Sequence, residues 1–272
     1  MSAKKRIGVK IPVAITIASS DCRGGAGIQA DLKTFAALGV HGSTAITSVT
    51  AQEGSSPVIL DNVTTMMIKK QIAAVASDMH IDAGKTGMLS TCKIIKTVAS
   101  ETSRYDFPLV VDPVMVTKSG IPILKKDAVN AMREYLLPKA TVATPNIPEA
   151  ELLTGIRIKT IADAEASATR IADLGPKAVV VKGGRLTEEE AVDILYYRGH
   201  FRVLRAPRFH VSTVRGSGCT FSAAIVAQLA KGQNIPSAVQ VAKTLVTMAI
   251  RSGLRVGKQY GPVNPMAYLV SR

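Results

Sequence analysis

Short apolar runs alternate with stretches of helical periodicity along most of this 272-residue chain, and this alternation restricts the folds open to it. The apolar runs that predict strands are residues 13–18, 43–49, 81–87, 108–114, 141–146 and 178–184. The segments with helical periodicity lie around residues 25–38, 65–79, 91–100, 125–136 and 162–174. Because parallel strands need a crossover that is usually a helix, the pattern predicts a mainly parallel sheet with helices on both faces.

The C-terminal third departs from this alternation. The stretch "DILYYRGHFRVLRAP" predicts two strands joined by a turn at Gly199 and His200, hence a β-hairpin near the sheet edge. Further helices are expected from about residues 219 and 235. No linker rich in Pro, Gly or Ser, no repeat and no low-complexity tract interrupts the chain, so we expect one three-layer α/β domain over residues 1–272.

The basic character of the chain raises the question of a nucleic-acid partner. Its 34 Lys and Arg against 20 Asp and Glu give a formal net charge of +14. The basic residues are spread along the chain, however, and aromatic residues, which would stack on bases, make up only 4%. We therefore expect no nucleic-acid partner, because solubility and attraction for small polyanionic substrates account for the charge equally well.

The cysteines and the N-terminus bear on the compartment. Cys22, Cys92 and Cys219 are widely spaced and form no CxxC pair, which argues against a disulfide framework or a zinc site and for a reducing compartment. The basic start is followed by the apolar run 13–18, which is too short for a signal peptide and predicts a first strand. No run approaches the roughly 20 residues of a membrane span, so we expect a cytoplasmic protein without a membrane partner.

The stretch "RGSGCTFSAAI" (215–225) combines glycines and a thiol with the start of an amphipathic helix. Gly216 and Gly218 let the backbone approach a ligand, and the free N–H groups of a first helical turn suit an anion, most simply a phosphate. We expect the same helix field to lower the pKa of the Cys219 thiol. The alternative is an ordinary loop before a core helix, with a small buried cysteine.

Polar residues follow three later strands of the predicted sheet. Asp112 precedes Pro113 and either orients Mg²⁺ through water or starts a turn. Asn146 and Glu149 stand three apart where a strand passes into a helix, so they either reach one metal shell or cap the helix. Lys182 ends a buried run before two glycines and either binds a phosphate or ends the strand at solvent.

The sequence argues against two common classes of nucleotide-binding protein. The segment 25–30 imitates a dinucleotide fingerprint, but its glycines lie several residues beyond the first strand, which disfavours a Rossmann dehydrogenase. No GxxxxGK[ST] stretch is present, so the chain is not a Walker-type NTPase.

Asp31, early in the helix that follows the first strand, is either a neighbour of the helix cap or a substrate contact. The remaining set of acidic residues, a lysine and an anion-binding helix start is what phosphoryl transfer requires.

Six segments together resemble a known family. In order and spacing, the stretch "IASSDCRGGAGIQADLKTFAALGVHGSTAITSVTAQ" and the shorter "KTGMLS", "VVDPVMVTKSG", "TPNIPEAELLTG", "VVVKGG" and "GSGCTFSAAI" resemble the hydroxymethylpyrimidine phosphate kinases of thiamine biosynthesis. That family belongs to the ribokinase-like superfamily. The resemblance covers nearly the whole chain, and it implies the three-layer ribokinase-like fold, a homodimer, and a substrate pair of ATP and an aminopyrimidine.

The resemblance also implies a reaction and its catalytic residues. The reaction is ATP- and Mg²⁺-dependent phosphorylation of 4-amino-5-hydroxymethyl-2-methylpyrimidine and then of its monophosphate. Cys219 matches the position at which most ribokinase-like sugar kinases carry an aspartate base. The residues implied as the anion hole are Gly216, Ser217 and Gly218, with Lys182 at the reacting phosphates.

The remaining roles are carried over in the same way. Gln52 is implied as the contact to the aminopyrimidine edge, and the residues implied around the ring are Ser19, Met88 and Val114, with Asp31 approaching it. Asn146 and Glu149 match the NxxE element for Mg²⁺ and phosphate, and Asp112 faces the phosphates. The resemblance implies that Glu149 and Asp112 hold the metal largely through water.

The chain departs from the family pattern at four positions. Arg215 replaces the usual His before the glycine loop, and it either contacts phosphate and adds affinity or weakens the bifunctional activity. Glu53 replaces an Asn, and Cys22 and Arg23 replace small residues. Two other functions therefore stay open at this point. One is a pyridoxal or pyridoxine kinase of the same architecture, and the other is a catalytically weak regulatory protein that keeps a nucleotide site.

Overall fold

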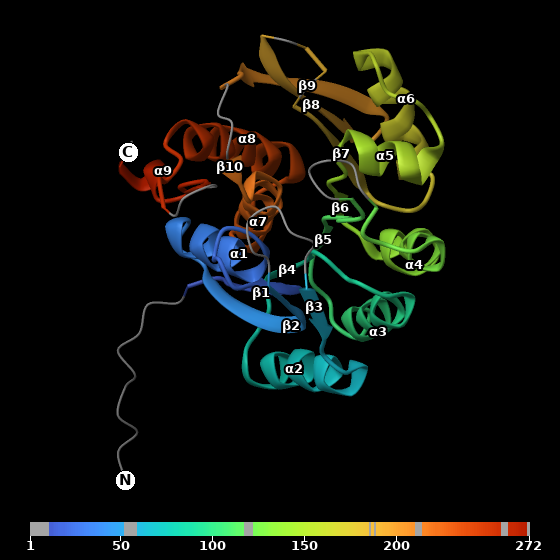
Figure 1. Ribbon diagram of the computed structural model, residues 1–272, viewed down its shortest axis with the longest axis vertical. Coiled ribbons are helices and arrows are strands. Elements are labelled where there is room, and N and C mark those ends of the chain that lie inside the picture. The colour runs from blue at the N-terminus through green and yellow to red at the C-terminus, as the bar shows by residue number, and fades with distance from the viewer. Residues whose placement is uncertain are drawn as a thin grey trace.

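The computed structural model describes residues 11–51, 59–116, 122–184, 186–187, 189–209, 214–256 and 261–270 (Figure 1). The strands of its main sheet are β1 (Val13–Asp21), β2 (His41–Ala51), β3 (Ile59–Asn62), β4 (Ala83–Thr86), β5 (Leu109–Val111), β6 (Val142–Ala143), β7 (Ala178–Gly183), β8 (Glu190–Tyr197) and β9 (His200–Pro207). A separate two-stranded sheet joins β10 (Val214–Arg215) and β11 (Gly261–Pro262).

Helices connect these strands. The helices are α1 (Gly27–Ala37), α2 (Thr65–Asp78), α3 (Cys92–Thr102), α4 (Lys126–Ala131), α5 (Ile147–Thr154), α6 (Ile161–Ala172), α7 (Ser217–Ala230), α8 (Ile235–Arg251) and α9 (Ala267–Val270). A π-helical turn, Met132–Leu136, and a 3₁₀ turn, Leu137–Lys139, continue α4. Over the described ranges, none of the helices has both the length and the apolar character needed to cross a bilayer.

The sheet is mainly parallel, as the alternation of runs predicts. Its strand order is β3-β2-β1-β4-β5-β6-β7-β8-β9, and every neighbouring pair from β2 to β7 is parallel. The strands β3, β8 and β9 pair antiparallel, so the predicted edge hairpin is confirmed. Its turn lies at Arg198 and Gly199, one residue earlier than expected, where both residues have positive φ as a tight hairpin requires.

Two hydrophobic cores lie on opposite faces of the sheet. Figure 1 shows α1, α7 and α8 on one side and α2 to α6 on the other, which makes three layers. Along β7, Val179 and Val181 belong to one core, whereas Ala178 and Val180 belong to the other. A strand covered on both faces has no solvent side, and this is why its sequence is a continuous apolar run.

The strands β5 and β6 are shorter than the runs that predicted them. Pro113 and Pro145 follow soon after these strands end, and proline has no N–H to donate to a ladder. The chain therefore leaves the sheet at Asp112 and Thr144, and the polar side chains that follow each strand gather at the carboxyl edge.

Candidate active site

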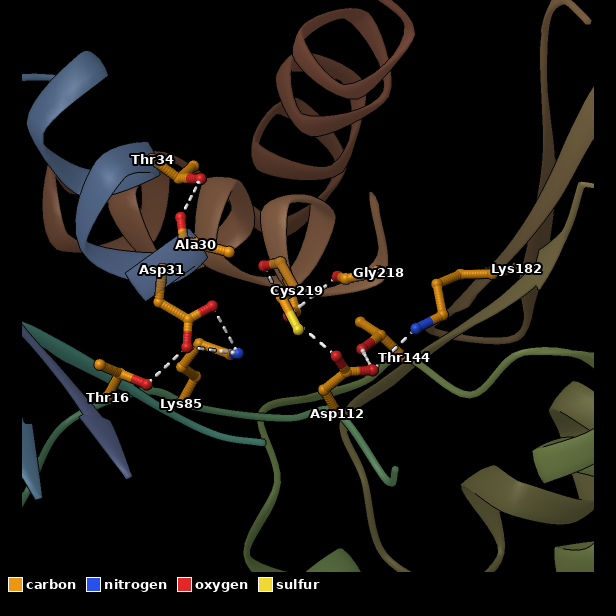
Figure 2. A network of polar contacts seen from close by, with 11 residues as sticks. Thr16, Ala30, Asp31, Thr34, Lys85, Asp112, Thr144, Lys182, Gly218 and Cys219 are labelled. Carbon is orange, nitrogen blue, oxygen red and sulfur yellow. Dashed lines mark hydrogen bonds and ion pairs between the residues drawn. The ribbon is translucent and has the colours of Figure 1, made fainter. Parts of the chain in front are cut away.

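Cys219 lies between two buried ion pairs at this carboxyl edge (Figure 2). One pair is Lys85 with Asp31, which come from β4 and α1. The other is Lys182, on β7, with Asp112, directly after β5. Four chain segments that are distant in the sequence thus supply charged groups around one thiol.

The glycine loop holds the start of α7 in a conformation that only glycine adopts easily. Gly216 is the N-cap residue with φ 87°, and a Cβ there would stand 1.9 Å from the carbonyl oxygen of Gly25. The first intrahelical bond runs from the Thr220 N–H to the Gly216 carbonyl at 2.9 Å. The N–H groups of Ser217 and Gly218 precede it, so this helix start has the form of the predicted anion hole.

The pKa of Cys219 corrects the prediction made from the helix start. Burial raises the pKa of this thiol to about 11, while the nearby Lys85 ammonium and an N–H from Gly27 only partly offset that rise. Asp31 and Asp112 push the pKa in the same direction as burial. The expected lowering is wrong, because the desolvation of a thiolate outweighs the helix field at this position.

The Lys85–Asp31 pair is sealed inside the protein. The Lys85 Nζ lies 2.9 Å from both carboxylate oxygens of Asp31, and the Thr16 hydroxyl donates to the same carboxylate at 2.7 Å. Both charged side chains are at most 1% exposed. Burial lowers the pKa of Lys85, but the charge of Asp31, followed by those of Cys219 and Asp112, raises it overall. Lys85 therefore stays an ammonium beside the thiol.

This geometry changes the role expected for Asp31. It lies in the interior of α1 and is no neighbour of the helix cap, which is Ala26. Its carboxylate is enclosed and engaged by Lys85 and Thr16. A direct substrate contact would require the pair to open, so we assign Asp31 to the fixation of Lys85 instead.

The Lys182–Asp112 pair is more open. The Lys182 Nζ lies 2.7 Å from Asp112 Oδ1, and hydroxyls of Thr144 and Ser222 donate to the same carboxylate at 3.1 and 3.2 Å. The Lys182 side chain is 15% exposed, and its Nζ would stand 3.4 Å from a Cβ on Gly218. The structure thus brings Lys182 to the predicted anion hole and keeps it in reach of solvent.

Asn146 and Glu149 form a capping box at the start of α5. The Asn146 side chain accepts the Glu149 N–H at 3.0 Å, and the Glu149 carboxylate accepts the Asn146 N–H at 2.8 Å. The structure thus shows the capping arrangement, and the metal role of the two residues stays a prediction. Burial raises the pKa of Glu149 to about 7, and Asp112 raises it as well, whereas Lys182 lowers it.

The donor set at these strand ends fits a water-mediated Mg²⁺ site. Within the described ranges, no group of three or more His, Cys, Asp or Glu side chains is arranged to hold a metal ion. Glu149 already accepts N–H groups of Asn146 and Met115, and Asp112 accepts from Lys182. Mg²⁺ often keeps several waters and takes one or two carboxylates plus substrate phosphates, which agrees with this pair of partly engaged carboxylates.

Arg215 lies beside the first loop. Its Nε is 3.7 Å from Asp21 Oδ2, and its side chain is 27% exposed. The Asp21 carboxylate also accepts the N–H groups of Gly25 and Ala26, at 3.1 and 2.9 Å. The Val263 N–H donates to the Arg215 carbonyl, so the C-terminal segment fixes the residue before the glycine loop.

The residues expected around the substrate ring are only partly described. Ser19 is buried at the end of β1, and Met88 and Val114 are half-buried after β4 and β5. These three strands are neighbours, so the structure gathers the three residues at one part of the sheet edge. Gln52 and Glu53 lie outside the described residues.

Sequence reasoning missed Lys85 and the Thr16 hydroxyl that donates to Asp31, and it missed the Thr144 and Ser222 hydroxyls that donate to Asp112. The lysine stands inside the predicted strand 81–87, where a charge needs a buried partner. That signal was present. The partner, Asp31, lies 54 residues away along the chain, so the pattern alone did not identify it.

Comparisons with known proteins show which family and which fold this chain resembles. Residues 21–264 match the family model described as phosphomethylpyrimidine kinase. The hydroxymethylpyrimidine/phosphomethylpyrimidine kinase of Haemophilus influenzae is 44% identical over 93% of this chain and 96% of its own length.

Solved structures give the same fold. The ADP complex of pyridoxal kinase from Bacillus subtilis has a TM-score of 0.91 and 38% identity, and it covers 96% of this chain and 100% of its own. The phosphomethylpyrimidine kinase of Clostridium difficile has a TM-score of 0.79 and 44% identity over 89% of this chain and 100% of its own. With the family model matching most of its length, this chain belongs to the phosphomethylpyrimidine kinase family.

Proposed function

We propose that this chain transfers the γ-phosphoryl group of ATP to the hydroxymethyl oxygen of 4-amino-5-hydroxymethyl-2-methylpyrimidine, and then transfers a second one to the resulting monophosphate. The observation that carries the proposal is the arrangement of Cys219 at the first turn of α7 with the Lys182 ammonium above Gly218. Backbone N–H groups and a lysine that lie close together are suited to stabilise the negative charge that develops on a phosphoryl group during its transfer.

Cys219 and Lys85 serve the proton transfer that accompanies the attack of the substrate hydroxyl. The substrate hydroxyl oxygen attacks the γ-phosphorus, and the bond from that phosphorus to the bridging oxygen of ADP breaks. The hydroxyl proton passes to Cys219 in its thiolate form, which thereby becomes a thiol. A thiol with a pKa of about 11 is ionised in about one molecule in ten thousand at pH 7, so its thiolate is rare but strongly basic. The Lys85 ammonium stabilises that thiolate.

The α7 start and Lys182 stabilise the phosphoryl group itself. Lys182 leaves Asp112 for a phosphate oxygen, and Asp112 keeps its hydrogen bonds from Thr144 and Ser222. Asp112 and Glu149 are the residues that would hold Mg²⁺, largely through water, and the ion would supply charge neutralisation to the ATP phosphates. Arg215, beside the glycine loop, adds positive charge for the anionic substrates.

The assembly is proposed as a homodimer of single-domain chains. Val49, Ile59, Met66 and Met67 are each more than half exposed at the β2–β3 edge and the start of α2. Such a gathering of apolar side chains on a surface supports a protein interface. The free cysteines among the described residues are consistent with a cytoplasmic location.

A pyridoxal kinase activity is the second candidate. The observation in its favour is the TM-score of 0.91 with the pyridoxal kinase of Bacillus subtilis over nearly the whole chain. Pyridoxal also carries a hydroxymethyl group on an aromatic ring, so the same phosphoryl site serves either substrate.

A turnover assay with three substrates separates these functions. The purified chain is incubated with ATP and Mg²⁺ and with hydroxymethylpyrimidine, its monophosphate or pyridoxal, and each product is identified by mass. Formation of the pyrimidine diphosphate supports the proposal, whereas pyridoxal phosphate alone selects the second candidate. Absence of Mg²⁺-dependent ADP release with every substrate overturns both and leaves a regulatory protein. Cys219→Ser is the control for background ATP hydrolysis.

A further inference from the structure

A third buried ion pair involves β8, the strand that pairs with the strand of Lys182. Lys243, on α8, donates to Asp193 Oδ2, on β8, at 2.7 Å and to the Ala191 carbonyl at 2.8 Å. Both side chains of the pair are less than 10% exposed. The second oxygen of Asp193 accepts the Gly183 N–H at 3.1 Å. Neither the motifs nor the reaction described above uses this pair.

Its position in the sheet connects it to the active site. In the antiparallel pairing of β7 and β8, Asp193 stands directly opposite Lys182. Residues opposite each other in such a pair project from the same face, with Cβ atoms about 4.5–5.5 Å apart. Asp193 is therefore the cross-strand carboxylate of Lys182. The Lys182 ammonium nevertheless bonds to Asp112, which directly follows β5, at 2.7 Å.

We propose that Lys243 is a positioning residue that occupies Asp193 and thereby leaves Lys182 directed toward Asp112 and the transferring phosphoryl group. The inference rests on the proposed function insofar as Lys182 serves the phosphates. Without Lys243, Asp193 is a buried carboxylate with no cation, which is costly in a protein interior. Lys182 has a flexible stem and stands directly across the ladder, so it turns to Asp193 and is withdrawn from the anion hole.

Three variants test whether Asp193 competes with Asp112 for the Lys182 ammonium. Lys243→Met lowers kcat by about tenfold or more, because Lys182 is held away from the phosphates. Asp193→Asn keeps an oxygen for the Gly183 N–H and removes the competing charge, so its kcat stays within about threefold of the parent chain.

The double variant gives the decisive comparison. Lys243→Met with Asp193→Asn recovers kcat to within about threefold of the parent, because no carboxylate remains to attract Lys182. A pair that only stabilises the fold also recovers its free energy of unfolding in the double variant, so the recovery is measured as kcat at saturating substrate, on variants that are folded at the assay temperature. A double variant as slow as Lys243→Met, or a Lys243→Met variant with the parent kcat, overturns the inference. Thermal unfolding of all three variants shows that each is folded at the assay temperature.

A crystal structure of Lys243→Met tests the inference apart from any activity. We expect the Lys182 Nζ within hydrogen-bond distance of Asp193, and a Lys182 that stays on Asp112 overturns the inference. If the parent chain phosphorylates no substrate, the proposed function fails, while this structure still decides where Lys182 goes. If Lys182→Met retains the parent kcat, the phosphate role of Lys182 fails, and the functional part of the inference fails with it.

Discussion

The two ion pairs beside Cys219 share a composition but differ in their surroundings. Each joins a strand lysine to an aspartate that also accepts a threonine hydroxyl, from Thr16 in one pair and Thr144 in the other. The Lys85–Asp31 pair is closed to solvent, whereas the Lys182 side chain is 15% exposed and lies over Gly218. The closed pair therefore fixes charge behind the thiol, and the open pair is able to exchange its carboxylate for a phosphate.

The difference also concerns what surrounds the two lysines. Burial lowers the pKa of Lys182, but Asp112 and then Glu149 raise it overall, whereas Asp31 is the leading carboxylate beside Lys85. An ammonium with two nearby carboxylates retains an anionic neighbour when one is displaced. Lys85 bonds to Asp31, and both side chains are enclosed, so no ligand reaches this carboxylate's partner.

Removing the lysine of the closed pair has the largest expected effect, and it acts on stability. Lys85→Met leaves the Asp31 carboxylate buried without a cation and lowers the free energy of unfolding by about 3–5 kcal/mol, measured by urea titration. The matched control is Lys85→Met with Asp31→Asn, which removes both charges and recovers most of the loss. An equal loss in both variants contradicts an electrostatic role for the pair.

The lysine of the open pair acts on catalysis instead. Lys182→Met lowers kcat by about 10²–10³-fold, because it removes a donor for the developing phosphoryl charge. Its effect on unfolding stays below that of Lys85→Met, because Thr144 and Ser222 still donate to Asp112. Steady-state kinetics and urea titration on the same preparations give both quantities. The comparison fails if Lys182→Met costs more stability than Lys85→Met.

The two threonines permit a matched test of the same difference. Thr16→Val and Thr144→Val each remove one hydroxyl donor to a buried carboxylate, and each lowers the free energy of unfolding by about 1.5–3 kcal/mol. Only Thr144→Val is expected to raise KM for ATP, because Asp112 then holds Lys182 more tightly. Equal KM values for the two variants contradict the exchange of partners at the open pair.

A pH dependence of stability is expected from Glu149, which lies next to the open pair. Burial raises the pKa of Glu149 from 4.5 to about 7 in the folded chain. The folded state therefore binds the extra proton between these values, and the Glu149 contribution to stability is present at low pH and is lost as pH rises through about 7. Glu149→Gln keeps a capping oxygen but cannot ionise.

Thermal unfolding of Glu149→Gln and the parent between pH 4.5 and 7.5 measures this dependence. The stability difference between variant and parent is expected to grow in favour of the variant as pH rises. A difference that is constant over this range contradicts the raised pKa of Glu149.

The sheet could be predicted from the sequence because its central strands are buried on both faces. Val179 and Val181 face one core and Val180 faces the other, so the whole run is apolar. The edge strand β3 was missed, because Ile59–Asn62 is short and mostly exposed and carries no such run. The hairpin was found from its glycine, and its turn was displaced by one residue.

The candidate site could be predicted less completely. Strand-end positions are visible in the pattern, and they placed Asp112 and Lys182 at the carboxyl edge of the sheet, where the structure pairs them. The pKa of Cys219 was wrong, because a sequence shows where a helix begins but not how much protein surrounds its first turn. The Lys85–Asp31 pair was missed for the related reason that its partners meet only through the fold.

A crystal structure of the chain with a non-hydrolysable ATP analogue and Mg²⁺ tests the contrast between the two pairs most directly. We expect the Lys182 Nζ within hydrogen-bond distance of a phosphate oxygen at the start of α7, with Lys85 still bound to Asp31. A Lys182 that keeps Asp112 while the phosphates lie elsewhere, or a Lys85 that turns from Asp31 to the phosphates, would contradict the account.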